Sequence, residues 1–277
     1  MALVSSRRRS AALVAVLGLS LVAGGVAYAA SAPAIQTSTP KFADQVTNID
    51  VLRQQIKNYY GDPLAVTGSG LTGTWTSPLN LDSNYAKEAS SVAADGARWL
   101  ATGWRGKASG MKAIVIDVDD TTLATWNYEI YSNWDYLPKT NGEFVTNELF
   151  PAVPGMVTMV DQANAEGYAI IVITGRPTGQ LAVTLGNLTN VGYPAPDLIF
   201  TKPETVLDYP SYLQTACSVE IRVGKSCTTD HYKAATRGYI ESLGYDIVAN
   251  FGDQFSDFTG GFEDRTFKMP NPNYFLP

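Results

Sequence analysis

The chain has 277 residues, of which 45% are hydrophobic and 17% charged, and its formal net charge is −6. This length and composition fit one large α/β domain with an insertion, or two modest domains, with a well-developed core. The acidic balance argues against a nucleic-acid polymer as a partner. A single histidine, His231, excludes metal centres and catalytic sites that need several histidines.

The first 29 residues are predicted to be a cleavable signal peptide. Arg7–Arg9 precede an apolar run over residues 11–26, and Ala27-Tyr28-Ala29 offers a small-residue cleavage site near Ala29. The run is short and Gly-rich for a membrane span, and no cysteine lies nearby to accept a lipid. We therefore expect a secreted protein without a stable membrane anchor, exported by either the general or the twin-arginine route. Cleavage removes three arginines and no acidic residue, which moves the net charge to −9.

The mature chain is expected to begin with a flexible lead-in and to continue as a single domain. Residues 30–43 are rich in Ser, Thr, Ala and Pro, and the domain covers residues 44–277. Apolar residues at helical spacing predict one helix within residues 46–61 and a second within residues 82–99. Both precede the first predicted strand, so we expect an N-terminal helical extension that packs on the sheet.

Short apolar runs, mostly β-branched, predict the strands of a parallel sheet flanked by helices. They lie at residues 113–116, 168–173, 198–200 and 246–251. After the first strand, residues 124–150 are crowded with aromatic side chains without a clear period, and we interpret them as a small cap insertion. Trp126 and Tyr128 in this insertion are predicted either to stack on a planar group of a substrate or to attach the insertion to its domain.

Cys217 and Cys227 are the only cysteines, and in an exported chain we expect them to form a disulfide. A reactive thiol served by His231 is the alternative. The alternating apolar residues from 219 to 223 predict a small β-hairpin held by that disulfide. The Pro- and Asn-rich tail, residues 270–277, is expected to lie over the surface without regular structure.

Polar residues and two glycines follow three of the predicted strands, at the point where each strand ends. They are Asp117, Asp119 and Asp120 after the first strand, Thr174, Gly175 and Arg176 after the second, and Gly252, Asp253 and Asp257 after the fourth. The carboxyl ends of parallel strands share one edge of a sheet, so these groups should converge, and Lys233 can join them from a helix. Carboxylates are the ligands that Mg²⁺ prefers, while the hydroxyl, the lysine and backbone amides can hold an anion. This combination predicts a site for a phosphoryl group and Mg²⁺.

The same residues resemble the four motifs of the haloacid dehalogenase-like (HAD) superfamily. These motifs are DxDxT at 117–121, a strand ending in Thr174, a lysine ahead of the last strand at Lys233, and GDxxxD at 252–257. The segments FPAVPGM (150–156), ITGRP (173–177), HYKAATR (231–237) and GDQFSDF (252–258) further resemble its branch of secreted, class B-like acid phosphatases, which includes the plant vegetative storage proteins. The resemblance covers residues 112–258 and implies a Rossmann-like HAD core.

The resemblance also implies a role for each residue. Asp117 would be the nucleophile and Asp119 the general acid and base, with Thr174 and Lys233 completing the catalytic set. The metal ligands would be Asp117, Asp119 through its backbone carbonyl, Asp253 and Asp257, the last of which could instead orient Lys233. The phosphate and the rest of the substrate would contact Thr174, Gly175, Arg176, Lys233, Trp126 and Tyr128. Lys202 is the alternative for the lysine, and Asp120 is expected to be structural.

The function predicted from these features is that of a secreted, Mg²⁺-dependent phosphomonoesterase acting through an aspartyl-phosphate. Its substrates would be small phosphate esters, and the aromatic insertion suggests nucleotides or aryl phosphates. A non-catalytic storage or binding protein on the same scaffold and a phosphotransferase are the alternatives. The presence of Asp117 favours an enzyme over a storage protein.

Overall fold

The computed structural model describes residues 39–61, 79–103 and 110–276. The predicted signal peptide and residues 30–38 of the predicted lead-in lie outside the described residues. Within the described ranges, no helix has both the length and the apolar composition needed to cross a membrane.

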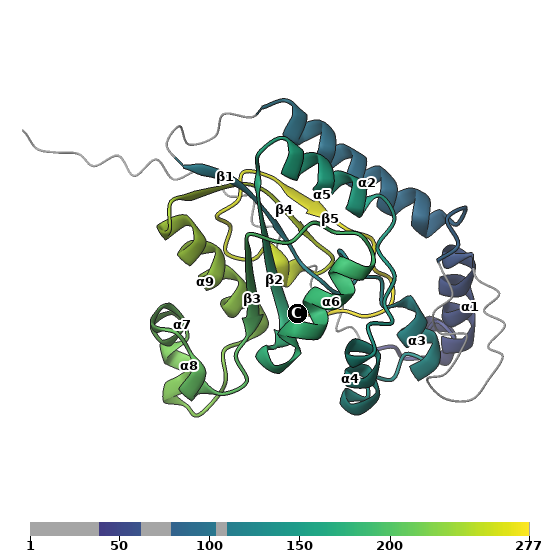
Figure 1. Ribbon diagram of the computed structural model, residues 1–277. Coiled ribbons are helices and arrows are strands. Elements are labelled where there is room, and N and C mark those ends of the chain that lie inside the picture. The colour runs from purple at the N-terminus through teal and green to yellow at the C-terminus, as the bar shows by residue number, and fades with distance from the viewer. Residues whose placement is uncertain (1–38, 62–78, 104–109, 277) are drawn as a thin grey trace, which may run out of the picture.

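A sheet of five parallel strands forms the centre of the molecule, in the order β3-β2-β1-β4-β5 (Figure 1). The strands are β1 (Met111–Ile116), β2 (Ala169–Pro177), β3 (Leu198–Lys202), β4 (Tyr245–Gly252) and β5 (Thr266–Lys268). All four pairings between neighbours are parallel, which confirms the predicted α/β class. The edge strand β5 was not predicted, because three residues are too few to carry a recognisable pattern.

Helices cover both faces of the sheet (Figure 1). Along β1, Ile114 and Ile116 point into one core while Ala113 and Val115 point into the other, which is why an uninterrupted apolar run is needed there. The first core lies under α2 (Asn84–Ala101), α5 (Met156–Ala165) and α6 (Leu181–Asn190), and the second under α7 (Ser211–Ala216) and α9 (Thr229–Ser242).

The N-terminal extension consists of α1 (Ile49–Tyr60) and α2, as predicted. The side chain of Asn48 accepts the backbone N–H groups of the first turn of α1, and Gly61 ends this helix in the left-handed conformation. Only Ile56 and Tyr60 of α1 are buried. The helix therefore attaches to the domain through its C-terminal half.

Two small helical lobes extend from the sheet (Figure 1). The predicted cap insertion contains α3 (Trp126–Ser132) and α4 (Pro138–Thr146), and the segment after β3 contains α7 and α8 (Ser218–Arg222). Short 3₁₀ turns occupy Ala43–Gln45, Thr178–Gln180, Val206–Asp208 and Phe255–Asp257.

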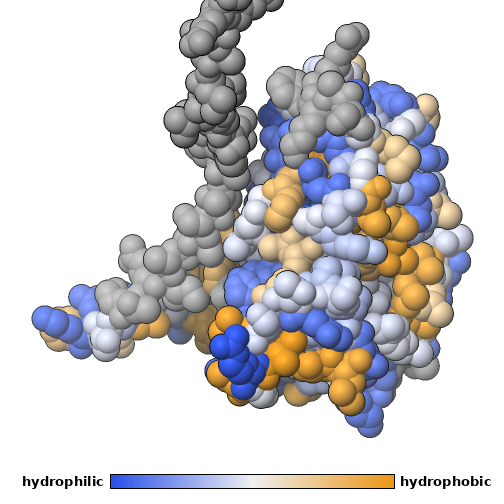
Figure 2. Space-filling model, turned by 90° about the vertical axis from the view of Figure 1, so that its left-hand side faces the viewer, coloured by the Kyte–Doolittle hydropathy of each residue, from blue (hydrophilic) through white to orange (hydrophobic). Residues whose placement is uncertain are grey.

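The predicted hairpin between the cysteines is wrong, because α8 occupies its place. Val219 and Val223 are four residues apart and share the exposed side of this segment, whereas Ile221 packs against the core. An alternation of so few residues fits either a strand or a short helix. The disulfide itself is confirmed: Cys217 is bonded to Cys227 with their Cα atoms 5.3 Å apart. Figure 2 shows apolar side chains interspersed with polar ones toward the lower end of the face that carries α7 to α9.

Candidate active site

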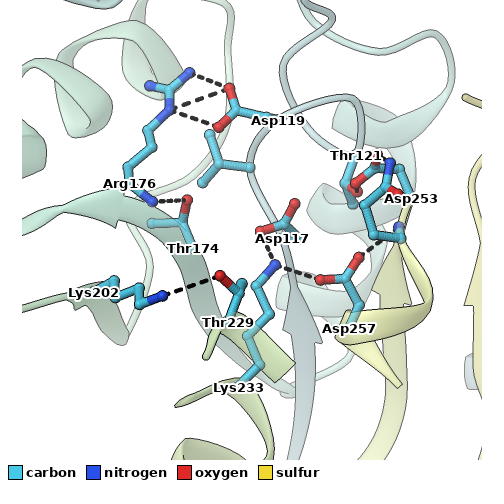
Figure 3. A network of polar contacts seen from close by, with 12 residues as sticks. Asp117, Asp119, Thr121, Thr174, Arg176, Lys202, Thr229, Lys233, Asp253 and Asp257 are labelled. Carbon is cyan, nitrogen blue, oxygen red and sulfur yellow. Dashed lines mark hydrogen bonds and ion pairs between the residues drawn. The ribbon is translucent and has the colours of Figure 1, made fainter. Parts of the chain in front are cut away.

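The polar residues predicted at the strand ends meet at the carboxyl edge of the sheet (Figure 3). Asp117 follows β1 directly, and its backbone N–H donates to the carbonyl of Phe251 in β4 at 3.1 Å. The hydroxyl of Thr122 donates to the carbonyl of Asp117 at 3.1 Å. These two contacts hold the main chain of Asp117 from both sides, so its side chain leaves the sheet in a fixed direction.

Three carboxylates form a buried cluster at this edge. Asp117, Asp253 and Asp257 are 6%, 2% and 2% exposed, and each offers an oxygen within 4.8 Å of the others. Lys233 reaches the cluster from α9, where its Nζ donates to Asp117 Oδ1 at 2.7 Å and to Asp257 Oδ1. The structure thus brings together the ends of β1 and β4 and the first turns of α9, as predicted.

The charges of this cluster are not balanced by the protein. Burial, opposed by Lys233 and reinforced by the neighbouring acids, raises the pKa of Asp117 to about 7, and burial also raises the pKa of Asp253 well above its ordinary value. Burial opposes the charge on Lys233, but Asp117 and Asp257 raise its pKa and keep it protonated. With all three carboxylates ionised, Lys233 leaves an excess of two negative charges among these four side chains, which a divalent cation would neutralise. Oxygen donors of this kind fit Mg²⁺.

The turn after β4 depends on the absence of a side chain at Gly252. A Cβ at this position would lie 2.3 Å from Oδ2 of Asp257. The same oxygen accepts the backbone N–H of Gln254 at 2.8 Å, which closes the turn. The GDxxxD spacing therefore places Asp257 beside Asp253 and next to Lys233.

Asp119 lies apart from the cluster and is held by Arg176. The guanidinium donates from Nε to Oδ1 and Oδ2 at 3.2 and 3.1 Å, and from its second terminal nitrogen to Oδ1 at 2.7 Å. Arg176 is itself fixed, because it donates to the hydroxyl of Thr184 at 3.1 Å and lies over the ring of Phe150. The side chain of Asp119 is 33% exposed, so it is accessible to solvent. Its carboxylate is not part of the three-acid cluster.

The remaining polar residues of β2 and β3 line the site next to the cluster. Thr174 is fully buried and its Oγ1 accepts the backbone N–H of Arg176 at 3.2 Å, while Gly175 is exposed. Lys202, the alternative lysine, donates to the hydroxyl of Thr229 at 3.1 Å. Lys233, not Lys202, therefore contacts the carboxylates.

Asp120 has contacts of a structural kind. It adopts a positive φ of 52°, and its carboxylate accepts the backbone N–H of Thr125 at 2.9 Å and the hydroxyl of Thr125 at 2.5 Å. Together these bonds shape the turn that leads into the cap insertion. Burial raises the pKa of Asp120 to about 6.

The two aromatic residues predicted to contact the substrate are buried. Trp126 is 3% exposed and stacks on Tyr60 with ring centres 3.9 Å apart, and Tyr128 is 1% exposed. The hydroxyl of Tyr128 accepts the backbone N–H of Leu137 at 2.8 Å. Trp126 thus attaches the insertion to the N-terminal extension, which was the alternative interpretation, while Tyr128 links parts of the insertion to each other.

Comparison with known proteins places the chain in a family. The family described as HAD superfamily, subfamily IIIB (acid phosphatase), matches residues 64–277. The chain belongs to this family. Its membership agrees with the order of strand-end motifs and with the parallel sheet on which they lie.

Curated relatives resemble the chain over part of its length, and a solved structure shares its fold. The stem 28 kDa glycoprotein of Glycine max is 32% identical over 58% of this chain and 59% of its own length. Acid phosphatase 1 of Solanum lycopersicum is 27% identical over 60% of each protein, so the match spans less than two thirds of either relative. The crystal structure of the class C acid phosphatase from Bacillus anthracis with tungstate bound has the same fold, with a TM-score of 0.51, 22% identity, and coverage of 68% of this chain and 80% of that one.

Sequence reasoning did not identify two residues that contact the carboxylates. Asn271 donates to Asp253 Oδ2 at 2.7 Å, and Gln254 donates to the same atom at 2.5 Å. Gln254 lies inside the GDxxxD motif, so its position in the sequence is next to a predicted metal ligand. Asn271 lies in a tail for which no regular structure was predicted, and no local pattern points to it.

Proposed function

We propose that the chain is a secreted phosphomonoesterase that hydrolyses small phosphate esters through an aspartyl-phosphate on Asp117. The observation that carries this proposal is the buried arrangement of Asp117, Asp253, Asp257 and Lys233. Asp119 is held separately by Arg176 and is partly exposed. The family to which the chain belongs supports the same reaction class.

In the proposed first step, a carboxylate oxygen of Asp117 attacks phosphorus and the bond from phosphorus to the ester oxygen breaks. Asp119 donates a proton to the departing alkoxide. In the second step, water attacks phosphorus while Asp119 accepts its proton, which releases inorganic phosphate and restores Asp117. Lys233 and Thr174 are positioned to hold the oxygens of the transferring group. Asp117, which is buried, thus acts as the nucleophile, and Asp119, which is partly exposed, acts as the general acid and base.

Asp117, Asp253 and Asp257, together with the backbone carbonyl of Asp119, would hold the divalent ion, for which we propose Mg²⁺. Such an ion supplies positive charge that neutralises the phosphate and lowers the barrier to attack by an anionic nucleophile. The protein contributes the fixed carboxylates, and Lys233 prevents Asp117 and Asp257 from separating.

Export is part of the proposal and is supported by two independent features. Arg7–Arg9, the apolar run and Ala27-Tyr28-Ala29 form the pattern of a signal peptide. The Cys217–Cys227 disulfide is typical of an oxidising compartment. Amino-terminal sequencing of the protein recovered outside the producing cell should begin close to residue 30, whereas a start at Met1 would contradict the proposed cleavage.

The decisive experiment is hydrolysis of p-nitrophenyl phosphate by the purified protein with Mg²⁺ or with EDTA. We expect activity with Mg²⁺, loss of activity in EDTA, and recovery on adding the ion. Asp117→Asn keeps the shape of the side chain but removes the nucleophile, so it should be inactive in both conditions. Full activity of this variant would refute the mechanism. Inactivity of the unmodified protein on a broad panel of phosphate esters would instead favour a storage role.

A further inference from the structure

The C-terminal segment, residues 270–276, returns to the carboxyl edge of the sheet after β5 (Figure 1). It has no regular structure, but its first asparagine contacts the buried acids. Nδ2 of Asn271 donates to Oδ2 of Asp253 at 2.7 Å and lies 3.4 Å from Oδ2 of Asp120. A residue near the end of the chain thus touches a carboxylate that is 2% exposed.

The segment is held at both ends independently of Asn271. Before it, the backbone N–H of Met269 donates to the carbonyl of Gly252 at 2.8 Å. At its other end, the backbone N–H of Leu276 donates to Oε1 of Gln254 at 2.9 Å. These two bonds do not involve the side chain of Asn271, so they remain when that side chain is replaced. Oδ1 of Asn271 also accepts the backbone N–H of Asn273 at 2.9 Å, a local contact within the segment.

A second asparagine fastens the middle of the segment to other parts of the protein. Nδ2 of Asn273 donates to the hydroxyl of Tyr60 in α1 at 2.9 Å, and its Oδ1 accepts Nε1 of Trp134 from the cap insertion at 3.3 Å. Asn273 contacts neither Asp253 nor any other acid of the cluster through these bonds. The two asparagines are therefore chemically identical groups with different partners.

The contact of Asn271 has a direct consequence for Asp253. Asn271 and Gln254 both donate to Oδ2, which fixes the plane of the carboxylate and leaves Oδ1 as the oxygen available to a cation. The hydroxyl of Thr121 lies 3.5 Å from Oδ1. Amide donors are uncharged, so they orient the carboxylate without cancelling the negative charge that a cation needs.

We propose that Asn271 is a positioning residue that orients Asp253 toward a divalent cation. This inference rests on the proposed function, because it assumes that the ion binds at Asp117, Asp253 and Asp257. It assigns a role in the site to the C-terminal segment, which lies beyond the four strand-end motifs. Groups that orient metal-ligating carboxylates commonly affect metal affinity about 10–100-fold when removed.

The test is direct binding of Mn²⁺ to the full chain, measured by electron paramagnetic resonance of the free ion, without substrate. Asn271→Ala and Asn271→Leu should each bind Mn²⁺ about 10–100-fold more weakly than the unmodified protein. The leucine variant keeps the size and branching of asparagine, so it preserves packing if alanine destabilises the fold. Circular dichroism and thermal unfolding in EDTA establish that each variant is folded.

Asn273→Ala is the matched control, since it removes the same amide from the same segment. We expect its Mn²⁺ affinity to equal that of the unmodified protein, even where its unfolding temperature falls. Unchanged affinity of both Asn271 variants would overturn the positioning role, as would an equal loss in Asn273→Ala. If the unmodified protein binds no Mn²⁺ at all, the proposed metal site itself fails, and this outcome is distinguishable from the others.

Discussion

The guanidinium of Arg176 holds the carboxylate of Asp119 by hydrogen bonds from two of its nitrogens, the shortest at 2.7 Å. Arg176 is buried and braced by Thr184 and Phe150, whereas Asp119 is partly exposed. The buried partner therefore positions the partly exposed one. This pairing engages the guanidinium of Arg176 with Asp119, so we expect Arg176 to act through that carboxylate.

Arg176→Ala should reduce kcat by up to about 10²–10⁴-fold, the contribution typical of a general acid. The loss should be larger for an alkyl phosphate than for p-nitrophenyl phosphate, because a good leaving group needs little protonation. Arg176→Lys keeps the charge but not the planar fork, and should be intermediate. Asp119→Asn should show the same dependence on leaving group. An equal loss of kcat on both substrates would mean that Arg176 does not act through Asp119.

Lys233 and Lys202 form a natural pair for testing which lysine serves the site. Lys233→Ala leaves Asp117 and Asp257 without their buried cation, so we expect a loss of about 3–5 kcal/mol in unfolding free energy and severe loss of activity. Lys202→Ala removes a contact to the hydroxyl of Thr229, and its unfolding free energy should change by only about 0.5 kcal/mol. Urea unfolding and phosphatase assays measure both. The reverse order of effects would assign the role to Lys202.

The pKa of Asp117 predicts how stability depends on pH in the absence of metal. Burial raises the pKa from 3.8 to about 7, so the folded protein keeps a proton that the unfolded chain releases. The free energy of unfolding in EDTA should therefore fall as the pH rises from about 4 to about 7. Asp117→Asn has no proton to lose there, so the unfolding temperature of the unmodified protein should fall relative to that of the variant between pH 4 and 7. Calorimetry at a series of pH values measures both unfolding temperatures. A constant difference between the unmodified protein and Asp117→Asn from pH 4 to 7 would contradict this prediction.

Much of this architecture could be predicted because its signals are local. The three inner strands β2, β1 and β4 carry apolar, mostly β-branched runs buried on both faces, and such runs have few other interpretations. Once the strands are parallel, topology alone brings Asp117, Thr174 and Asp253 to one edge. The choice of Lys233 over Lys202 came from the resemblance to HAD motifs, and the contact of Lys233 with Asp117 agrees with it.

Other features depend on tertiary contacts that no local pattern encodes. Helix α8 and a hairpin both fit the alternation around Ile221, and packing against the second core selects the helix. The pairing of Arg176 with Asp119 joins residues far apart in sequence, and the contact of Asn271 depends on the path of an irregular tail. The orientation of Trp126 into the core likewise follows from the position of Tyr60 on a helix that precedes the sheet.

Gly252 provides a steric test of the site. An added Cβ would lie 2.3 Å from Oδ2 and 2.4 Å from Cβ of Asp257, so Asp257 must move and its bond to Lys233 must weaken. A displacement of about 1 Å in such a site commonly costs about 10²-fold in activity, which we expect for kcat/KM of Gly252→Ala. Gly142→Ala is the control, because the nearest atom to an added Cβ there is Nε2 of Gln180 at 3.9 Å. Gly142 lies within α4, so alanine should preserve activity and stabilise the helix by about 0.5–1 kcal/mol. Equal activity of the two variants would show that the position of Asp257 does not limit the reaction.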